Sequence, residues 1–400
     1  MTPPRRRVLI AGVSARAMAE SAVRAGYPVV AIDAYGDLDL AAIAPVVALR
    51  GSRHFDARAA ARASRSVRVS AVAYLSNFEN DPAAVRSLAV GRELLGNRPP
   101  TLARARDSRL VARILSHEGI AAPAVRASPP PPQSGSRNGT GHQRQWLVKP
   151  RRSGGGHGVR SWVPGSPVPR HSLVQERIRG RLGSIIFVAD GRDAVAFALT
   201  RQLAGERAFG ARGFLYCGSI LVPGGDGYFA GADDALLARA IRLARVLTRE
   251  LGLIGVNGID FVERGGEPWA IEVNPRFTAS MELAERAYGV SVFALHAAAC
   301  RGVLPALDLS RLRRRSRGAA GKAVLYARRA VTVADTRRWL SDRSVSDVPP
   351  AGSRIARGRP ICTIFAREAT TAACHQSLVR RAAALYSEVE NAGGGGDARE

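Results

Sequence analysis

The chain has 400 residues, 46% of them hydrophobic, and a formal net charge of +26 at pH 7. This length predicts two or three folded domains, and no apolar run approaches the roughly 20 residues that a membrane-spanning helix needs. The apolar run near the N-terminus ends at Ser14 and Arg16, too early for a secretory signal. We therefore expect a cytoplasmic protein with no membrane partner.

Arginine carries almost all of the positive charge, since the chain has 57 arginines and only two lysines, Lys149 and Lys322. The arginines are spread along the whole sequence rather than gathered in one tract, which indicates compositional drift. We therefore do not expect a nucleic-acid partner, while a general attraction for anionic substrates is consistent with the charge. The four cysteines lie far apart and lack the spacing of a metal or redox site.

The first hundred residues alternate between apolar strands and helical segments. The strands are predicted at 8–13, 28–33 and 71–75, with a helix at 15–25 that Ser14 caps. This alternation predicts a doubly wound, Rossmann-like domain. Its first turn, Gly12 to Arg16, lacks the three-glycine dinucleotide fingerprint, so NAD binding is not expected.

Residues 107–119 predict an amphipathic helix, and residues 129–145, rich in Pro, Ser, Gly and Asn, predict a flexible insertion. The central elements are then strands at 146–149 and 172–178, a hairpin of 184–190 with 194–200, a helix at 233–251, strands at 258–263 and 268–273, and a helix at 280–302. Small β elements at 321–327, 353–357 and 360–366 precede a last helix at 372–391, and we expect the tail at 392–400 to be disordered.

Lys149 ends a predicted strand and is followed by the glycine segment, which we define as residues 153–158 (SGGGHG). Lysine is a compact point charge that suits a tight phosphate pocket, and glycines let backbone N–H groups approach phosphate oxygens. The segment is not a Walker A loop, because no Gly-Lys-Ser or Gly-Lys-Thr ends it. Taken alone, it also fits a plain flexible loop, with His157 as a local hydrogen-bonding residue rather than a base.

A second strand ends at Gln175 and Glu176 and leads through Ile178 into the turn at Gly180. Such a strand end presents backbone groups that an adenine ring can use. Without other signals, the same residues would be an ordinary strand end.

Acidic and amide side chains converge on two neighbouring predicted strands. Asp260 lies on the first, and Glu272 and Asn274, two residues apart on the second, point to one face. Two carboxylates and an amide oxygen suit Mg²⁺, whereas the apolar flanking residues argue against a solvated surface strand. Arg276 follows, where its charge would oppose the negative charge that develops on a transferred phosphoryl group.

In this order, the strand lysine, glycine segment, Gln-Glu strand and Asp with Glu-x-Asn resemble the ATP-grasp superfamily. The turn at 12–16 and the stretch at 272–283 (EVNPRFTASMEL) are similar to the predicted ATP-dependent carboligases related to biotin carboxylase. The resemblance implies an α/β (α+β) fold with a Rossmann-like pre-ATP-grasp domain at 1–100, a two-lobed ATP-grasp domain at 101–305 and a small β-rich region at 318–391.

The resemblance also implies roles for these residues. Lys149 and Arg276 would be catalytic, with Lys149 on the ATP α- and β-phosphates and Arg276 facing an acyl phosphate. The remaining implied contacts are to ATP, from Gly154, Gly155, Gly156, His157, Gly158, Gln175, Glu176 and Ile178, and to Mg²⁺ or Mn²⁺, from Asp260, Glu272 and Asn274.

Two positions depart from the family pattern. Many relatives have a second ATP-contacting lysine near residue 108, where this chain has Ser108 beside Arg106 and Arg109. Many also have an acid that binds the ribose, where this chain has Arg181-Leu182-Gly183.

The implied reaction is activation of a small-molecule carboxylate by ATP and attack of an amine on the acyl phosphate. Such proteins have been linked to one-carbon cofactor pathways based on tetrahydromethanopterin and methanofuran, and the resemblance allows a homodimer. Arg201, Gln202 and Tyr216 lie on strands where they either face the second substrate or are structural. Two alternatives stay open: a carboxylase acting through carboxyphosphate, and a nucleotide- or nucleic-acid-binding protein without catalysis.

Overall fold

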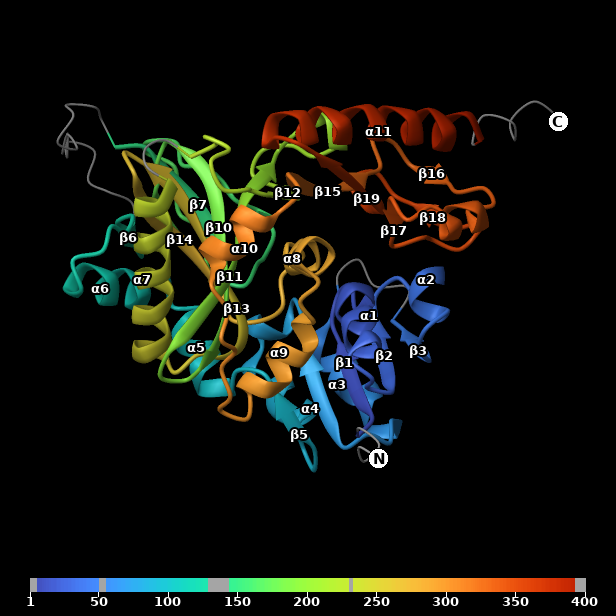
Figure 1. Cartoon of the computed structure of the whole chain (residues 1–400), viewed down its shortest axis with the longest axis horizontal. Coiled ribbons are helices and arrows are strands. Elements are labelled where there is room, and N and C mark those ends of the chain that lie inside the picture. Colours follow the sequence, from blue (N-terminus) through green and yellow to red (C-terminus); the bar gives the residue numbers. More distant parts are fainter. Residues whose placement is uncertain (1–5, 50–54, 129–143, 230–232, 393–400) are drawn as a thin grey trace.

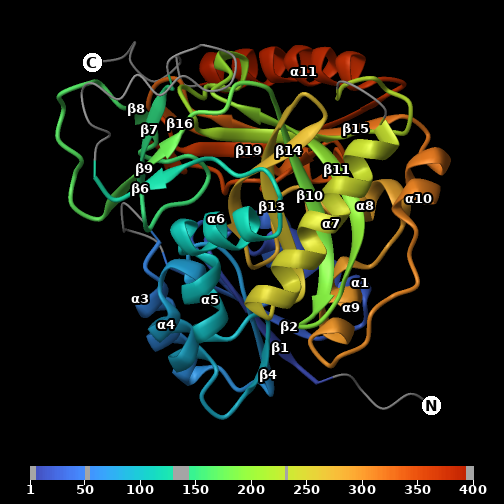
Figure 2. The same ribbon diagram turned by 90° about the vertical axis from the view of Figure 1, so that its left-hand side faces the viewer.

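The computed structural model describes residues 6–49, 55–128, 144–229 and 233–392. The predicted insertion at 129–145 lies outside these residues except for its last two positions, as does the predicted tail except for its first. Within them, a parallel sheet and a large antiparallel sheet, each covered by helices, confirm the predicted α/β fold class (Figures 1 and 2).

The N-terminal lobe, defined as residues 8–105, is built on a five-stranded parallel sheet in the order β3-β2-β1-β4-β5. Its strands are β1 (Val8–Ala11), β2 (Val29–Asp33), β3 (Val46–Ala48), β4 (Ala71–Tyr74) and β5 (Glu93–Leu95). Its helices are α1 (Arg16–Arg24), α2 (Leu38–Ala41), α3 (Ala57–Ala63), α4 (Pro82–Leu88) and α5 (Pro99–Ala105), with short 3₁₀ turns η1 (Ser64–Ser66) and η2 (Phe78–Asn80).

Side chains of β1 alternate between two cores, as expected for a strand buried on both faces. Val8 and Ile10 pack in the core that contains residues of α1. Leu9 and Ala11 pack in the opposite core with residues of α3 and α4. Helices therefore cover both faces of this sheet, which is the doubly wound arrangement that the sequence predicted.

An eight-stranded antiparallel sheet in the order β14-β13-β10-β11-β12-β15-β19-β17 forms the centre of the molecule. Its strands are β10 (Arg181–Asp190), β11 (Ala194–Ala204), β12 (Tyr216–Leu221), β13 (Ile254–Arg264), β14 (Glu267–Asn274), β15 (Ala319–Tyr326), β17 (Val345–Ser346) and β19 (Pro360–Glu368). Around it lie α7 (Asp233–Leu251), α8 (Met281–Tyr288), α9 (Val292–Ala299), α10 (Leu309–Arg315), α11 (Thr371–Ala392), η3 (Arg207–Phe209) and η4 (Arg337–Ser341).

Two helices cover different parts of this sheet. The apolar side of α7 packs on β10, β11 and β13 (Figure 2), whereas α11 packs on β15 and β19 (Figure 1). We call β15, β17 and β19, with the two-stranded ribbon of β16 (Val331–Thr332) and β18 (Arg354–Ile355), the C-terminal strands. Because β15 pairs with β12, the strands β15, β19 and β17 continue the central sheet, whereas β16 and β18 form a separate ribbon.

A small antiparallel sheet in the order β6-β9-β7-β8 carries the predicted lysine and the Gln-Glu pair. Its strands are β6 (Val125–Arg126), β7 (Trp146–Pro150), β8 (Arg160–Ser161) and β9 (Ser172–Glu176), and α6 (Ser108–His117) precedes it. None of the helices in the described residues combines the length and apolarity that crossing a bilayer requires.

Two local predictions are wrong. The helix predicted at 280–302 is two helices, because Gly289 takes a left-handed conformation (φ +70°) that ends α8. Ser14 does not cap the first helix, whose N-cap is Ala15 without a side-chain hydrogen bond. Asp33 stabilises the turn before this helix instead. Its carboxylate accepts hydrogen bonds from the backbone N–H groups of Ala15, Tyr35 and Gly36.

Candidate active site

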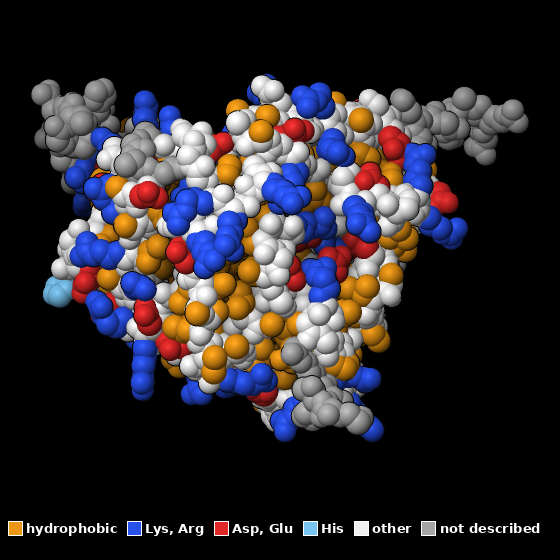
Figure 3. Space-filling model, viewed as in Figure 1, with side chains coloured by type: hydrophobic (Ala, Val, Ile, Leu, Met, Phe, Trp, Pro, Cys, Tyr) orange, Lys and Arg blue, Asp and Glu red, His pale blue; other side chains and the backbone are white. Residues whose placement is uncertain are grey.

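A cleft of about 2180 Å³ separates the N-terminal lobe, the small sheet and the central sheet. Residues from all three line it, including Lys149, Asp260 and Lys322. Both lysines of this arginine-rich chain therefore lie in the same cleft. On the outer face in Figure 3, by contrast, Lys and Arg side chains are spread among acidic and apolar ones.

Lys149 points from β7 toward β14, the edge strand of the central sheet. Its Nζ donates to Gln175 Oε1 at 3.0 Å and to the carbonyl oxygen of Ile271 at 3.1 Å. Loss of hydration lowers the pKa of this ammonium, and nearby Glu272 opposes the shift. Gln175 therefore positions the lysine, and the chain brings a desolvated cation to the boundary between the two sheets.

The predicted metal ligands do lie together. Asp260 and Glu272 are direct partners across β13 and β14, and Asn274 Nδ2 donates to Asp260 Oδ2 at 2.9 Å. This bond uses the side-chain nitrogen of Asn274, so the side-chain oxygen Oδ1 is the atom that could bind a metal. No group of three or more His, Cys, Asp or Glu in the described part of the chain is arranged for a metal, so this candidate set is two carboxylates completed by an amide.

The pKa values of the two carboxylates are shifted in opposite directions. Burial and the neighbouring Glu272 raise the pKa of Asp260 to about 6. Burial would also raise the pKa of Glu272, but Arg106 and Lys149 outweigh it and the pKa lies below its usual value. Glu272 raises the pKa of Asp260, so the two carboxylates repel each other, and a divalent cation between them would relieve that repulsion.

If Asp260 is a metal ligand, its raised pKa makes the metal affinity depend on pH. Below about pH 6 a proton competes for this carboxylate, so the affinity for Mn²⁺ should fall by roughly tenfold per pH unit. Electron paramagnetic resonance of free Mn²⁺ between pH 5 and 7.5 would measure this. Asp260→Asn should weaken binding and flatten the profile. An affinity that is constant over this range in the unmodified protein would remove Asp260 from the site.

Arg106, the residue that follows α5, is a site residue that the sequence did not single out. Its Nη1 donates to Glu272 Oε1 at 2.6 Å, and its Nη2 donates to the carbonyl oxygen of Ser153 at 2.6 Å. The side chain is 14% exposed. It lies two positions before Ser108, where many relatives have a lysine, so a cation is present in this region but on a different residue.

The glycine segment passes close to the start of β12. The N–H of Tyr216 donates to the carbonyl oxygen of Gly155 at 2.9 Å, and a Cβ on Gly156 would lie 1.8 Å from the Phe214 oxygen. Only glycine fits there, and its φ of +76° is also unfavourable for other residues. Gly154, Gly155, Gly156 and His157 line the cleft, whereas Gly158 does not and instead abuts Pro150.

Arg276 is held by the N-terminal lobe. Its Nε donates to Glu79 Oε1 at 2.8 Å, and its Nη1 donates to the carbonyl oxygen of Phe277 at 3.0 Å. Glu79 has no exposed side-chain surface, and its second oxygen lacks a hydrogen-bond partner among the described residues. Nη2 approaches Gly154, where an added Cβ would lie 3.9 Å away. Glu79 thus directs one edge of the guanidinium toward the glycine segment.

Removing the Glu79 carboxylate should disturb turnover more than nucleotide binding. We expect Glu79→Ala to lower ADP formation by about 100-fold, because a catalytic group displaced by about 1 Å loses this much, and Glu79→Gln to retain part of the activity. Affinity for MgATP should stay within about twofold. Glu93→Ala, which breaks an exposed Arg301 ion pair of the same lobe, is the control. Equal losses in all three variants would contradict the assignment.

Glu176 and Ile178, the residues predicted to contact the adenine, differ in their surroundings. The backbone N–H of Glu176 donates to the Ala124 carbonyl at 2.8 Å, and its carboxylate accepts from the Ala124 N–H at 3.2 Å. Glu176 therefore secures β9 to the segment before β6. Ile178 lies beyond the end of β9, is buried and lines the cleft. Leu147 and Ile271 also line the cleft and add aliphatic surface.

Arg181, at the position of the ribose-binding acid of many relatives, and the strand residues Arg201, Gln202 and Tyr216 have different surroundings. Arg181 donates to the backbone carbonyl of Tyr228 and is not among the residues that line the cleft. Gln202 lines the cleft and donates to Asp260 Oδ1 at 2.6 Å. Tyr216 also lines the cleft, whereas Arg201 stacks over Tyr228 and pairs with Glu206.

Comparison with known proteins gives a family match for the central segment and a fold for the chain. The family model described as an ATP-grasp domain matches residues 105–280. A search of the curated proteins gives no match.

Several solved structures are similar to the chain. Rhizobium etli pyruvate carboxylase T882A with acetyl coenzyme A has a TM-score of 0.70 and 14% identity, over 94% of this chain and only 37% of that protein. N5-carboxyaminoimidazole ribonucleotide synthetase from Thermus thermophilus has a TM-score of 0.65 and 18% identity, over 96% and 98%. The biotin carboxylase domain of Hydrogenobacter thermophilus 2-oxoglutarate carboxylase, solved as a dimer with MgADP, ADP and bicarbonate, has a TM-score of 0.66 and 14% identity, over 94% and 88%. At these identities the likeness establishes the fold alone.

Proposed function

Since residues 105–280 belong to the ATP-grasp family, we propose that this protein is an ATP- and Mg²⁺-dependent ligase that activates a carboxylate as an acyl phosphate and joins it to an amine. One observation carries the proposal. Lys149, Arg106 and Arg276 are all close enough to lower the pKa of Glu272, which pairs with Asp260 in a cleft large enough for a nucleotide and a second ligand.

In this proposal, the lysine and the two arginines bind different phosphate groups of ATP. Lys149 binds the α- and β-phosphates as a point charge, and the glycine segment covers them with backbone N–H groups. Arg106 and Arg276 face the region where the transferred phosphoryl group gathers negative charge. Gln175 and Glu79 act through Lys149 and Arg276, since each holds its cation by a hydrogen bond of 3.0 Å or less.

Asp260, Glu272 and Asn274 are the residues that would hold Mg²⁺ or Mn²⁺. When bound, the cation would neutralise charge on the triphosphate and on the transferred group. Arg106 keeps Glu272 ionised for this role, and Gln202 and Asn274 orient Asp260 through its two oxygens. Ile178, Leu147 and Ile271 provide the apolar surface for the adenine.

The decisive experiment is a screen for ADP formation across pairs of carboxylates and amines with MgATP. ADP formation that requires both partners, with a new amide in the product, supports the ligase. The carboxylase alternative is favoured by the likeness to the synthetase and biotin carboxylase structures, and bicarbonate-dependent ADP formation would select it. Absence of turnover with intact MgATP binding would select the non-catalytic alternative.

The proposal also includes an acceptor from one-carbon cofactor pathways and a homodimer. An acceptor from the tetrahydromethanopterin or methanofuran pathways should be included in the screen as a glutamate acceptor. The homodimer prediction is addressed by the molar mass in solution, measured by light scattering.

A further inference from the structure

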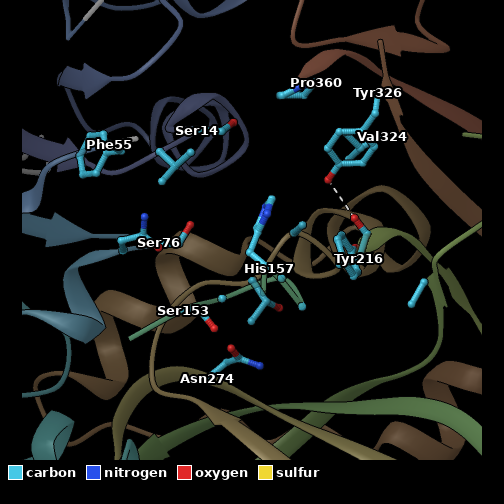
Figure 4. Close-up of a pocket in the computed structure, with 18 of the residues that line it drawn as sticks. Ser14, Phe55, Ser76, Ser153, His157, Tyr216, Asn274, Val324, Tyr326 and Pro360 are labelled. Atoms are coloured by element: carbon cyan, nitrogen blue, oxygen red, sulfur yellow. Dashed lines mark hydrogen bonds between the residues drawn. The ribbon is translucent and has the colours of Figure 1, made fainter. Parts of the chain in front are cut away.

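The cleft is larger than a nucleotide requires. Its volume of about 2180 Å³ is more than twice the roughly 1,000 Å³ at the upper end of sites for drug-sized ligands. We define the acceptor chamber as the part of the cleft between Phe55 of the N-terminal lobe and Val324, Tyr326 and Pro360 of the C-terminal strands. Figure 4 shows these side chains on opposite sides, with His157 and Ser153 lying between them and Asn274.

Both walls of the acceptor chamber carry apolar side chains, beside polar ones such as Asp56 and Ser353. Phe55 is joined on its side by Leu49, and Pro360 and Val324 are joined on theirs by Ile355. Tyr326 is held from two directions, because its hydroxyl donates to the Tyr216 carbonyl and its own carbonyl accepts from the Tyr386 hydroxyl, each at 2.8 Å. Two hydrogen bonds therefore fix the position of Tyr326 in the second wall.

A cluster of charged side chains joins the N-terminal lobe to the C-terminal strands. Arg16 of α1, 1% exposed, donates to Asp347 beside β17 at 2.8 Å and to Glu282 of α8 at 2.7 Å. The carboxylate of Asp39 in turn accepts from the backbone N–H groups of Asp347 and Val348. The N-terminal lobe and the C-terminal strands are thus joined by residues that line the same cleft, which makes the chamber a preformed site.

Arginines give one rim of the chamber a positive charge. Arg354 and Arg357 are exposed, line the cleft and form no ion pair with any described residue. A guanidinium in this state is available for a carboxylate or phosphate. Opposed apolar walls favour a flat ring, which would bury its faces between them. Ammonia, bicarbonate or a small amino acid would leave those walls in contact with water.

We propose that the acceptor chamber binds the amine substrate and selects one with a flat, largely apolar body and an anionic end. This inference rests on the proposed ligase function, because it assigns the second substrate of the same cleft. It makes Phe55 and the pair Arg354 and Arg357 specificity-determining residues, with no part in binding the nucleotide.

Three small amines separate the two recognition elements. Calorimetry in the presence of the non-hydrolysable MgAMP-PNP would compare 4-(aminomethyl)benzoate, which has a ring and a carboxylate, with benzylamine and with glycine. We expect 4-(aminomethyl)benzoate to bind at least tenfold more tightly than either of the others. Binding of glycine or benzylamine with equal affinity, or no binding of 4-(aminomethyl)benzoate, would overturn the proposal.

Substitutions then test whether the acceptor chamber is responsible for this difference in affinity. Phe55→Ala, and separately Arg354→Ala with Arg357→Ala, should weaken 4-(aminomethyl)benzoate at least fivefold while MgAMP-PNP affinity is unchanged. Arg343→Ala, an exposed arginine among the C-terminal strands outside the cleft, should have no effect. Unchanged affinity in the chamber variants would overturn the proposal. Failure of the unmodified protein to bind MgAMP-PNP, with probe binding intact, would instead refute the proposed ligase function.

Discussion

The Glu272→Gln variant should lose about 100- to 1000-fold of its ADP-forming activity, the range found when one group that stabilises transition-state charge is removed. Glu272 is kept ionised by Arg106 and Lys149 and lies directly opposite Asp260. A neutral amide cannot supply the negative charge that a divalent cation requires there. The change also leaves Arg106 without the carboxylate that holds its guanidinium.

A matched control separates this effect from a general effect on β14. Glu267→Gln alters an exposed carboxylate of the same strand, whose partner is Arg239, and should leave activity within about twofold, as for most surface substitutions. Circular dichroism and thermal unfolding should show both variants folded. Undiminished turnover in the Glu272 variant, measured as ADP release, would refute the proposed metal site.

The Lys149→Met variant should bind a MgATP analogue about 10- to 100-fold more weakly, because a hydrogen bond to a charged group contributes about 1.5–3 kcal/mol. The ammonium lies where β7 meets the edge strand β14, and its position is set by Gln175 and the Ile271 carbonyl. Lys149→Arg should be almost as weak, because the planar guanidinium does not fit a pocket shaped around a compact ammonium. Titration calorimetry with MgAMP-PNP measures both.

Arg160 provides the comparison for Lys149. It lies on β8, opposite Val148 of β7, and is exposed. Arg160→Ala removes a cation from the same small sheet and should leave nucleotide affinity unchanged. If Lys149→Met and Arg160→Ala weaken binding equally, the interaction is only a general attraction of a basic protein for an anion, and Lys149 loses its assigned role.

The sequence by itself determined the element types and the metal candidates. Apolar runs and turn residues identify strands and helices because their periods are local. Asp260, Glu272 and Asn274 could be placed together because a tight hairpin at Gly265 and Gly266 sets the register of two adjacent strands. Lys149 stood out because lysine is rare in this chain.

Only the tertiary structure decided which distant residues complete the candidate site. Glu79 meets Arg276 and Arg106 meets Glu272 across 197 and 166 positions of sequence, separations at which no periodicity carries information. The same holds for Arg16, which joins α8 and the residue after β17 to the N-terminal lobe. Such contacts arise when separately patterned lobes pack, because burial of a charged group requires a partner that the packing itself supplies.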